Sequence, residues 1–219
     1  MTDGPHVHQY SDGEFMLAYG PKNGPQIFVL QPLFEEMNRC RALVSGLCRA
    51  LAAKGIGCWL PDLPGTGESL SALEAVTWAQ WIEAVEAATT LIAAETGEAP
   101  WSVALRGGAL VEAGKLTRRW RLSPTTGRSL LSDLRRSALA SGSDPATPAG
   151  YRLGDDLSAK LATVEPVAGA HIRTVRLLSD DREADHRIAG APIWRRPEPV
   201  SDPTLLNAVV EDIAGWAIS

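Results

Sequence analysis

The residues with the clearest chemical implication lie at a turn near the middle of the chain, where residues 104–108 read ALRGG. The apolar run at residues 101–105 is typical of a buried strand, and the residues after the turn are compatible with a helix. A turn of this kind, flanked by small residues, exposes the nucleophilic serine of many hydrolytic enzymes. Here the central residue is Arg106, whose guanidinium stays protonated and has no lone pair with which to attack a carbonyl.

Two adjacent acids, Glu35 and Glu36, follow an apolar run at residues 27–30 and open a predicted helix. Carboxylates in the first turn of a helix interact favourably with the helix dipole, by about 0.3–1 kcal/mol each when exposed. This structural role accounts for at least one of the two. Leu33 and Phe34 come just before them, in the loop that follows the strand.

A third segment, DLPGTGES at residues 62–69, has two glycines and a terminal serine, as a phosphate-binding loop would. It lacks the lysine of that motif, so a tight structural turn after a strand is the favoured interpretation. Ser69 on this turn, Ser102 within a predicted strand and Cys58 within another have no base placed to activate them. A nucleophile without a base is the weaker half of covalent catalysis.

Strand-like and helix-like patterns alternate along the chain, which predicts a mostly parallel sheet flanked by helices. We expect strands at residues 15–19, 27–30, 57–60, 101–105, 119–122, 172–178 and around 192–196, and helices at about 36–54, 77–96, 129–139, 155–161 and 203–216. Thr77 with Gln80 forms a capping-box signature, and Asp202 with Pro203 is typical of a helix start. We expect the segment carrying His6 and His8 to be mobile.

The length of 219 residues fits a single domain, residues 1–219, in which about 124–165 form a cap or lid insertion bordered by the Gly/Ser/Pro-rich loop at 141–150. A net charge of −5 argues against a nucleic-acid binder, and the chain lacks an apolar run long enough to span a membrane. The polar N-terminus has no apolar signal core, so a cytoplasmic protein is expected. The three cysteines, Cys40, Cys48 and Cys58, are interpreted as buried free thiols. The sequence predicts no cofactor and no metal site.

Taken in order, these segments resemble the α/β-hydrolase superfamily, which implies a three-layer α/β sandwich with a mostly parallel central sheet and a small cap segment. More narrowly, residues 31–41, the turn DLPGTGES, the arginine-bearing ALRGGA and the tail GAPIWRRPEPV resemble the exosortase-A-system-associated hydrolases of type two. Proteins of that group occur beside exopolysaccharide and protein-sorting genes. The resemblance covers the chain from about residue 14 onward.

The α/β-hydrolase resemblance implies a catalytic triad in the order serine, acid, histidine. Asp180 or Asp181 follows a late strand, where the acid belongs. The loop that should carry the histidine reads Val-Ser-Asp-Pro at residues 200–203 and has none, while His186 lies only five residues beyond Asp181. With the serine and the histidine both missing from their places, ordinary serine-hydrolase chemistry is not expected.

In this fold the loop carrying Glu35 and Glu36 lies across from Arg106. Our first hypothesis is that Arg106 pairs with one of the two glutamates, because an unpaired buried charge costs several kcal/mol. The second is that Arg106, together with Gly107, Leu33 and Phe34, binds a small anionic or acyl ligand. A non-catalytic binding or accessory protein is the favoured function. The alternative is a hydrolase of an ester, thioester or acyl substrate that uses Arg106, Glu35, Glu36, Asp180 and Asp181, with paired carboxylates as general acid and base.

Overall fold

An eight-stranded sheet forms the centre of the molecule, in the order β1-β2-β4-β3-β5-β6-β7-β8. The computed structural model describes residues 4–141 and 150–218. β1 and β2 are antiparallel, β2 is antiparallel to β4, and the strands from β4 to β8 run parallel to one another. The strands are β1 (His6–Ser11), β2 (Glu14–Tyr19), β3 (Gln26–Leu30), β4 (Gly57–Pro61), β5 (Trp101–Leu105), β6 (Arg119–Leu122), β7 (Ile172–Leu177) and β8 (His186–Ile188).

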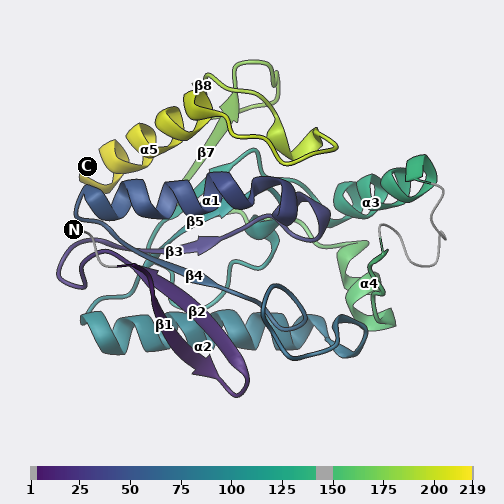
Figure 1. Cartoon of the computed structure of the whole chain (residues 1–219), viewed down its shortest axis with the longest axis horizontal. Helices are drawn as coiled ribbons and strands as arrows, with labels where there is room; N and C mark the ends of the chain where they lie inside the picture. Colours follow the sequence, from purple (N-terminus) through teal and green to yellow (C-terminus); the bar gives the residue numbers. More distant parts are fainter. Residues whose placement is uncertain (1–3, 142–149, 219) are drawn as a thin grey trace.

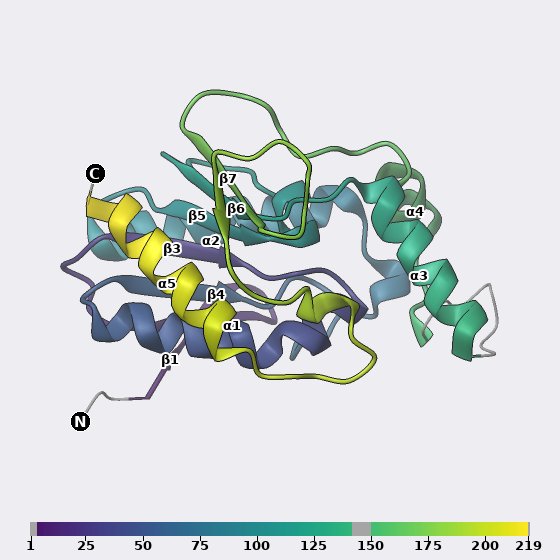
Figure 2. The ribbon, with the colours of Figure 1, turned by 90° about the horizontal axis from the view of Figure 1, so that it is seen from above.

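Helices cover both faces of the sheet, which gives three layers (Figures 1 and 2). α1 (Glu35–Ala53) and α5 (Pro203–Ile218) lie on one face, and α2 (Trp78–Thr96) lies on the other. α3 (Gly127–Ser141) and α4 (Asp155–Leu161) belong to the connection from β6 to β7 and lie beyond one end of the sheet. None of the helices in the described ranges combines the length and the apolar character needed to cross a membrane.

Each face of the sheet has its own apolar core, as expected for strands buried on both sides. Val29, Val103 and Trp120 pack towards α1 and α5. Phe28 and Trp59 pack towards α2, whose buried stripe includes Trp81 and Val85. Because side chains alternate along a strand, the buried segments 27–30 and 101–105 contribute to both cores.

The predicted helix starts are present. Thr77 and Gln80 form a complete capping box at the start of α2. Asp202 accepts a hydrogen bond from the backbone N–H of Leu205 at 2.9 Å and so caps α5, with Pro203 as the first helical residue. Caps of this kind are worth about 1 kcal/mol each.

Three expectations were wrong. Residues 6–11 are not a loose segment but form β1, which pairs with β2. The predicted helix after residue 106 is absent: a short 3-10 helix, η2 (Arg106–Leu110), is followed by a loop through residue 118. The extended segment expected around 192–196 is a 3-10 turn, η4 (Ile193–Arg195), and the last strand is β8. Most of the loop expected at 141–150 lies outside the described residues.

The strand order places a topological switch point between β3 and β5, since the chain leaves β3 for β4 on one side while β5 pairs with the other side. In open α/β sheets, the crevice beyond the carboxyl ends of such strands is the usual binding site. Leu30 near the end of β3 is aligned with Ala104 of β5. The start of α1, which carries Glu35 and Glu36, and the turn carrying Arg106 therefore meet at this point.

Candidate active site rebuilt around Arg106

Arg106 keeps the backbone conformation of a sharp strand-to-turn elbow. Its φ of +53° lies in the left-handed region, which costs a non-glycine residue about 1–3 kcal/mol. The backbone of the turn lies against the end of β3: a methyl group added at Gly108 would lie 2.3 Å from the carbonyl oxygen of Leu30. The small residue at 108 is therefore required by the close approach of backbone, as the sequence pattern predicts.

The guanidinium of Arg106 is paired with Glu36. Its Nη2 donates to Oε1 at 3.0 Å, and its Nε lies 3.3 and 3.2 Å from Oε1 and Oε2. The Arg106 side chain is 5% exposed and that of Glu36 is 9% exposed, so solvent screens the pair only weakly. The prediction that Arg106 pairs with one of the two glutamates is confirmed, and the partner is Glu36.

Two further groups complete the surroundings of the Arg106 cation. Nη1 donates to the backbone carbonyl of Ser123, just after β6, at 2.8 Å. The ring of Trp194, in η4 after β8, lies over the guanidinium with its centroid 5.1 Å from Cζ, a cation–π distance. Arg106 is thus held by groups that follow β3, β6 and β8.

Backbone strain concentrates at this site. Within residues 4–141 and 150–218, the non-glycine residues with positive φ are Phe34, Arg106, Ser123 and His171. The first three follow β3, β5 and β6 at the same edge of the sheet. Such conformations persist only where surrounding structure enforces them, and they cluster at functional sites. The strained residues therefore mark this edge of the sheet as the candidate functional site.

Burial affects the pKa of Glu36 more strongly than its pairing with Arg106 does. It raises the pKa of Glu36 above its ordinary value, although the charge and hydrogen bonds of Arg106 act in the opposite direction. Burial also raises the pKa of the neighbouring Cys40 thiol to about 12, so this thiol stays protonated and inert. Cys40, Cys48 and Cys58 are all buried and free, as predicted.

Apolar side chains lie beside Cα of Gly107, the residue whose backbone N–H would contribute to the oxyanion hole of a serine hydrolase. A methyl group added at Gly107 would lie 3.2 Å from a methyl carbon of Leu130 and 3.3 Å from Cγ of Leu33. Phe34, also buried, turns the other way and packs against Trp81 and Tyr151. Of the predicted binding residues, Leu33 therefore lies beside Gly107, whereas Phe34 faces away from it.

A cavity of about 520 Å³ lies beside the ion pair, between the start of α1, the helix α3 and η4. Glu35, Glu36 and Arg39 of α1 form one wall, and Trp194 and Arg195 form another. The third wall belongs to α3 and comprises Leu130, Asp133, Leu134, Arg136 and Ser137. Glu35, which is not the partner of Arg106, lies in this cavity with Arg39, whose Nε is 3.6 Å from it.

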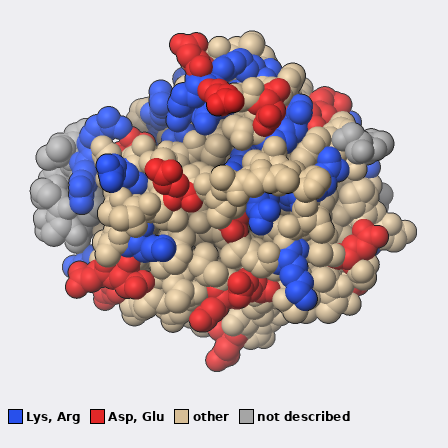
Figure 3. Space-filling model, turned by 180° about the vertical axis from the view of Figure 1, so that it is seen from behind, with Lys and Arg blue, Asp and Glu red and all other residues tan. Residues whose placement is uncertain are grey.

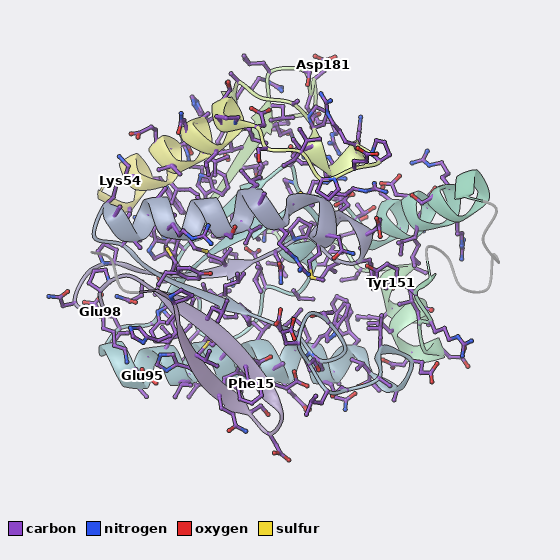
Figure 4. All side chains as sticks on the ribbon, in the orientation of Figure 1. Phe15, Lys54, Glu95, Glu98, Tyr151 and Asp181 are labelled. Carbon is purple, nitrogen blue, oxygen red and sulfur yellow. The ribbon has the colours of Figure 1, made fainter. Side chains whose placement is uncertain are left out.

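Neither of the two aspartates that complete the predicted constellation is a hydrogen-bond partner of Arg106 in the described residues. Asp180 accepts hydrogen bonds from Arg182 and Arg176, and the Arg182 contacts hold the pKa of Asp180 well below its ordinary value. A carboxylate of such low basicity is a poor general base. Asp181 is exposed at the tip of the loop between β7 and β8, and its side chain points away from the helices around the cavity (Figure 4).

The four histidines also lie away from Arg106. His6 and His8 are on β1, and His8 contacts Glu95 at 3.0 Å. His171 is exposed before β7, and His186 lies 3.6 Å from Asp212 of α5. The loop after β8, which supplies the histidine in serine hydrolases of this architecture, instead supplies Trp194.

The other nucleophile candidates are engaged in structural contacts. The hydroxyl of Ser69 donates to Glu14 and accepts from the backbone of Gly65, which fixes the turn at 62–69. Ser102 donates to the buried Glu112 at 2.6 Å, and Glu112 also pairs with Arg121. The part of the chain that the structure describes contains no group of three or more acids, histidines and cysteines that could hold a metal ion.

Solved structures similar to this chain share its architecture over nearly the whole length. Est1E from Butyrivibrio proteoclasticus with bound ferulic acid matches with a TM-score of 0.61 and 15% identity, covering 97% of this chain and 98% of that one. A hypothetical protein from Pseudomonas aeruginosa gives 0.56 and 12%, covering 98% and 92%. The bottromycin epimerase BotH in complex with bottromycin A2 gives 0.52 and 15%, covering 98% and 100%. Comparison of the sequence with protein-family models and with curated proteins gives no match.

The sheet order and these similarities establish that the chain has the α/β-hydrolase fold. In this chain the turn that follows β5 carries Arg106.

Sequence reasoning did not identify Trp194 or Ser123 as partners of Arg106. The choice between the two glutamates could have been made, because Glu36 lies four and seven positions before Cys40 and Leu43, on the buried stripe of α1.

Proposed function

We propose that this protein is a non-catalytic α/β-hydrolase-like binding or accessory protein. The observation that carries the proposal is the saturation of the Arg106 cation by Glu36, the Ser123 carbonyl and the Trp194 ring. A substrate carbonyl at the elbow would meet no nucleophile, because Arg106 stands at the position of the serine. The pairing of Asp180 with Arg176 and Arg182 and the exposed position of Asp181 argue against the alternative hydrolase mechanism.

The cavity beside the ion pair is the proposed binding site. It combines an arginine on each of its three walls with the apolar Leu33, Leu130 and Leu134, which suits a small ligand that carries both an acidic and an apolar part, such as an acyl carboxylate. The Nε1 of Trp194 and the Nε of Arg39 are buried donors with no hydrogen-bond acceptor. Residues 124–165, which include α3, serve in this proposal as a small cap over the site.

The first test concerns chemistry. We expect neither labelling by a fluorophosphonate probe nor turnover of short-chain nitrophenyl esters, because the elbow has no nucleophile and the described histidines lie elsewhere. An Arg106→Ser variant that folds should also stay silent, since the new hydroxyl would still lack a base. Labelling is read by gel fluorescence and turnover by absorbance, with an active serine esterase as positive control. Labelling or turnover by the unaltered protein would refute the proposal.

The second test concerns binding. Octanoate, measured by titration calorimetry, should bind the unaltered protein more tightly than the neutral octanamide. We expect an Arg39→Met/Arg195→Met double variant to lose about tenfold or more in affinity, because each charge-assisted hydrogen bond contributes about 1.5–3 kcal/mol. The matched control is Arg41→Met/Arg49→Met, which removes two exposed arginines elsewhere on α1 and should bind normally. Equal affinity for octanoate and octanamide, or no binding of octanoate, would contradict this site.

The biological setting of the proposal comes from the sequence. The segments at 31–41, 62–69 and 104–109 and the tail GAPIWRRPEPV support an accessory role in exopolysaccharide or exosortase systems. Two residues of the tail, Trp194 and Arg195, form part of the cavity wall.

A further inference from the structure

The face of the sheet that carries α2 is only half covered by helix. α2 packs over the half formed by β1 to β4, where its buried residues contact Met16, Phe28 and Trp59. In the described residues, the connections from β5 to β6 and from β7 to β8 contain no α-helix, and α3 and α4 lie beyond the strand ends. On this side, the half formed by β6 to β8 therefore has loops where a helical layer would lie.

Arginines line the half without a helix. Because side chains alternate, the residues between the core-facing positions of β6, β7 and β8 point to this side. They include Arg119, Arg121, Arg176 and Arg187. Arg176 and Arg187 are direct neighbours in the register of β7 and β8, an arrangement of like charges that is unfavourable without counter-charges.

The arginines of this half outnumber the acidic side chains that pair with them. Glu112 forms ion pairs with Arg121 and, at 3.9 Å, with Arg119. Asp180 forms ion pairs with Arg176 and Arg182. Arg187 donates to the backbone carbonyl of Arg182 at 2.6 Å.

Arg121 and Arg176 are buried beneath the loops, whereas Arg119 and Arg187 are partly exposed. Beside them, Val167 and Leu178 are 44% and 65% exposed. Arginine combined with exposed apolar side chains is typical of protein interfaces.

The outer surface of α2 carries acidic side chains, whose charge is opposite to that of the arginines on β6 to β8. A shallow groove along it is lined by residues at helical spacing, which are Glu83, Glu86, Ala87, Thr90, Leu91 and Ala94. The stripe is acidic and contains small residues that allow close approach. Figure 3 shows this side of the molecule, with Lys and Arg gathered over its upper part and groups of Asp and Glu along its lower part.

We propose that two copies of this chain associate face to face through this side, so that α2 of each copy packs on the β6–β8 face of the other. A two-fold axis satisfies both contacts at once, as in closed isologous dimers. In this arrangement the ridge of α2 in one copy packs on the loops that cover β6 to β8 in the other. Glu83 and Glu86 would supply acceptors for the arginines.

Sedimentation velocity between about 1 and 500 μM tests this association. The unaltered protein should form dimers that weaken as salt is raised, because rim charges are screened. Glu86→Arg, an exposed substitution that should leave folding intact, should weaken dimerisation at least tenfold, and Arg187→Glu should do the same. The double variant Glu86→Arg/Arg187→Glu restores opposite charges across both contacts and should recover most of the affinity.

Lys54→Glu is the matched control, because Lys54 lies at the end of α1 in the layer on the opposite face of the sheet. It should leave the dimer unchanged. A protein that stays monomeric throughout the concentration range would overturn the proposal, as would a dimer that the Glu86 variant does not weaken. If Arg187→Glu proves unfolded by circular dichroism, the Glu86 variant and a Glu83→Arg/Glu86→Arg variant decide the question alone.

Discussion

Replacing Glu36 by alanine should lower the free energy of unfolding by about 3–5 kcal/mol, since removing one partner of a buried ion pair leaves an uncompensated charge. The remaining guanidinium of Arg106 would keep only the Ser123 carbonyl and the Trp194 ring. Urea denaturation of the variant, followed by circular dichroism, measures the loss. The matched control is Glu35→Ala, which removes the neighbouring acid from a partly exposed ion pair and should cost at most about 1 kcal/mol.

The double variant Glu36→Leu/Arg106→Met separates the cost of an orphaned charge from the worth of the pair. Buried ion pairs replaced by apolar residues of similar volume are often neutral or more stable by about 1–4 kcal/mol. We therefore expect the double variant to be more stable than Glu36→Ala by several kcal/mol. A loss below about 1 kcal/mol in Glu36→Ala would show that the pair is weaker than its burial implies.

Gly108→Ala should be among the most damaging single-methyl additions in the chain, with an expected loss of about 3 kcal/mol or more. The added carbon would lie 2.3 Å from the carbonyl oxygen of Leu30 and 2.7 Å from that of Gln31. Both obstacles are backbone atoms at the end of β3, so relief requires the sheet edge itself to move. Thermal and urea unfolding of the purified variant would measure the loss.

Gly107→Ala is the control, because it adds the same methyl group one residue earlier. There the nearest atoms are side-chain carbons of Leu130 and Leu33 at 3.2 and 3.3 Å, which can shift by a few tenths of an ångström. Its cost should stay below about 1 kcal/mol, and the reduced entropy of the unfolded chain offsets part of it. Equal effects at the two glycines would mean that the turn does not lie against β3 as described.

Much of the fold could be predicted because local signals and the hydrophobic pattern agreed. The capping box at Thr77 and Gln80, the cap at Asp202 and the apolar strands at 27–30 and 101–105 all specify the same elements. The order of these elements then implied the sheet. The pairing of Arg106 with a glutamate was also predictable, since a cation buried at the switch point requires a carboxylate.

The unpredicted elements are those whose stability comes from distant residues. β1 contains a single buried residue, Tyr10, so its sequence lacks the alternation of a half-buried strand. After η2, the expected helix is replaced by a loop in which Glu112 pairs with Arg121 of the next strand and Gly114 adopts a φ of +74°. Trp194 reaches Arg106 from 88 positions further along the chain, and local pattern carries no information about such a contact.

The surroundings of Arg106 have a consequence for motion as well as for chemistry. One guanidinium joins four segments, the start of α1, the elbow after β5, the residue after β6 and the turn after β8. Any local opening that frees one of them exposes a charge whose partners remain buried, so these segments should exchange their amide hydrogens as one cooperative unit. Catalytic loops are commonly drawn from the least stable parts of a protein. In this chain the corresponding segments are instead joined through a single cation, so we expect this edge of the sheet to open only as a whole.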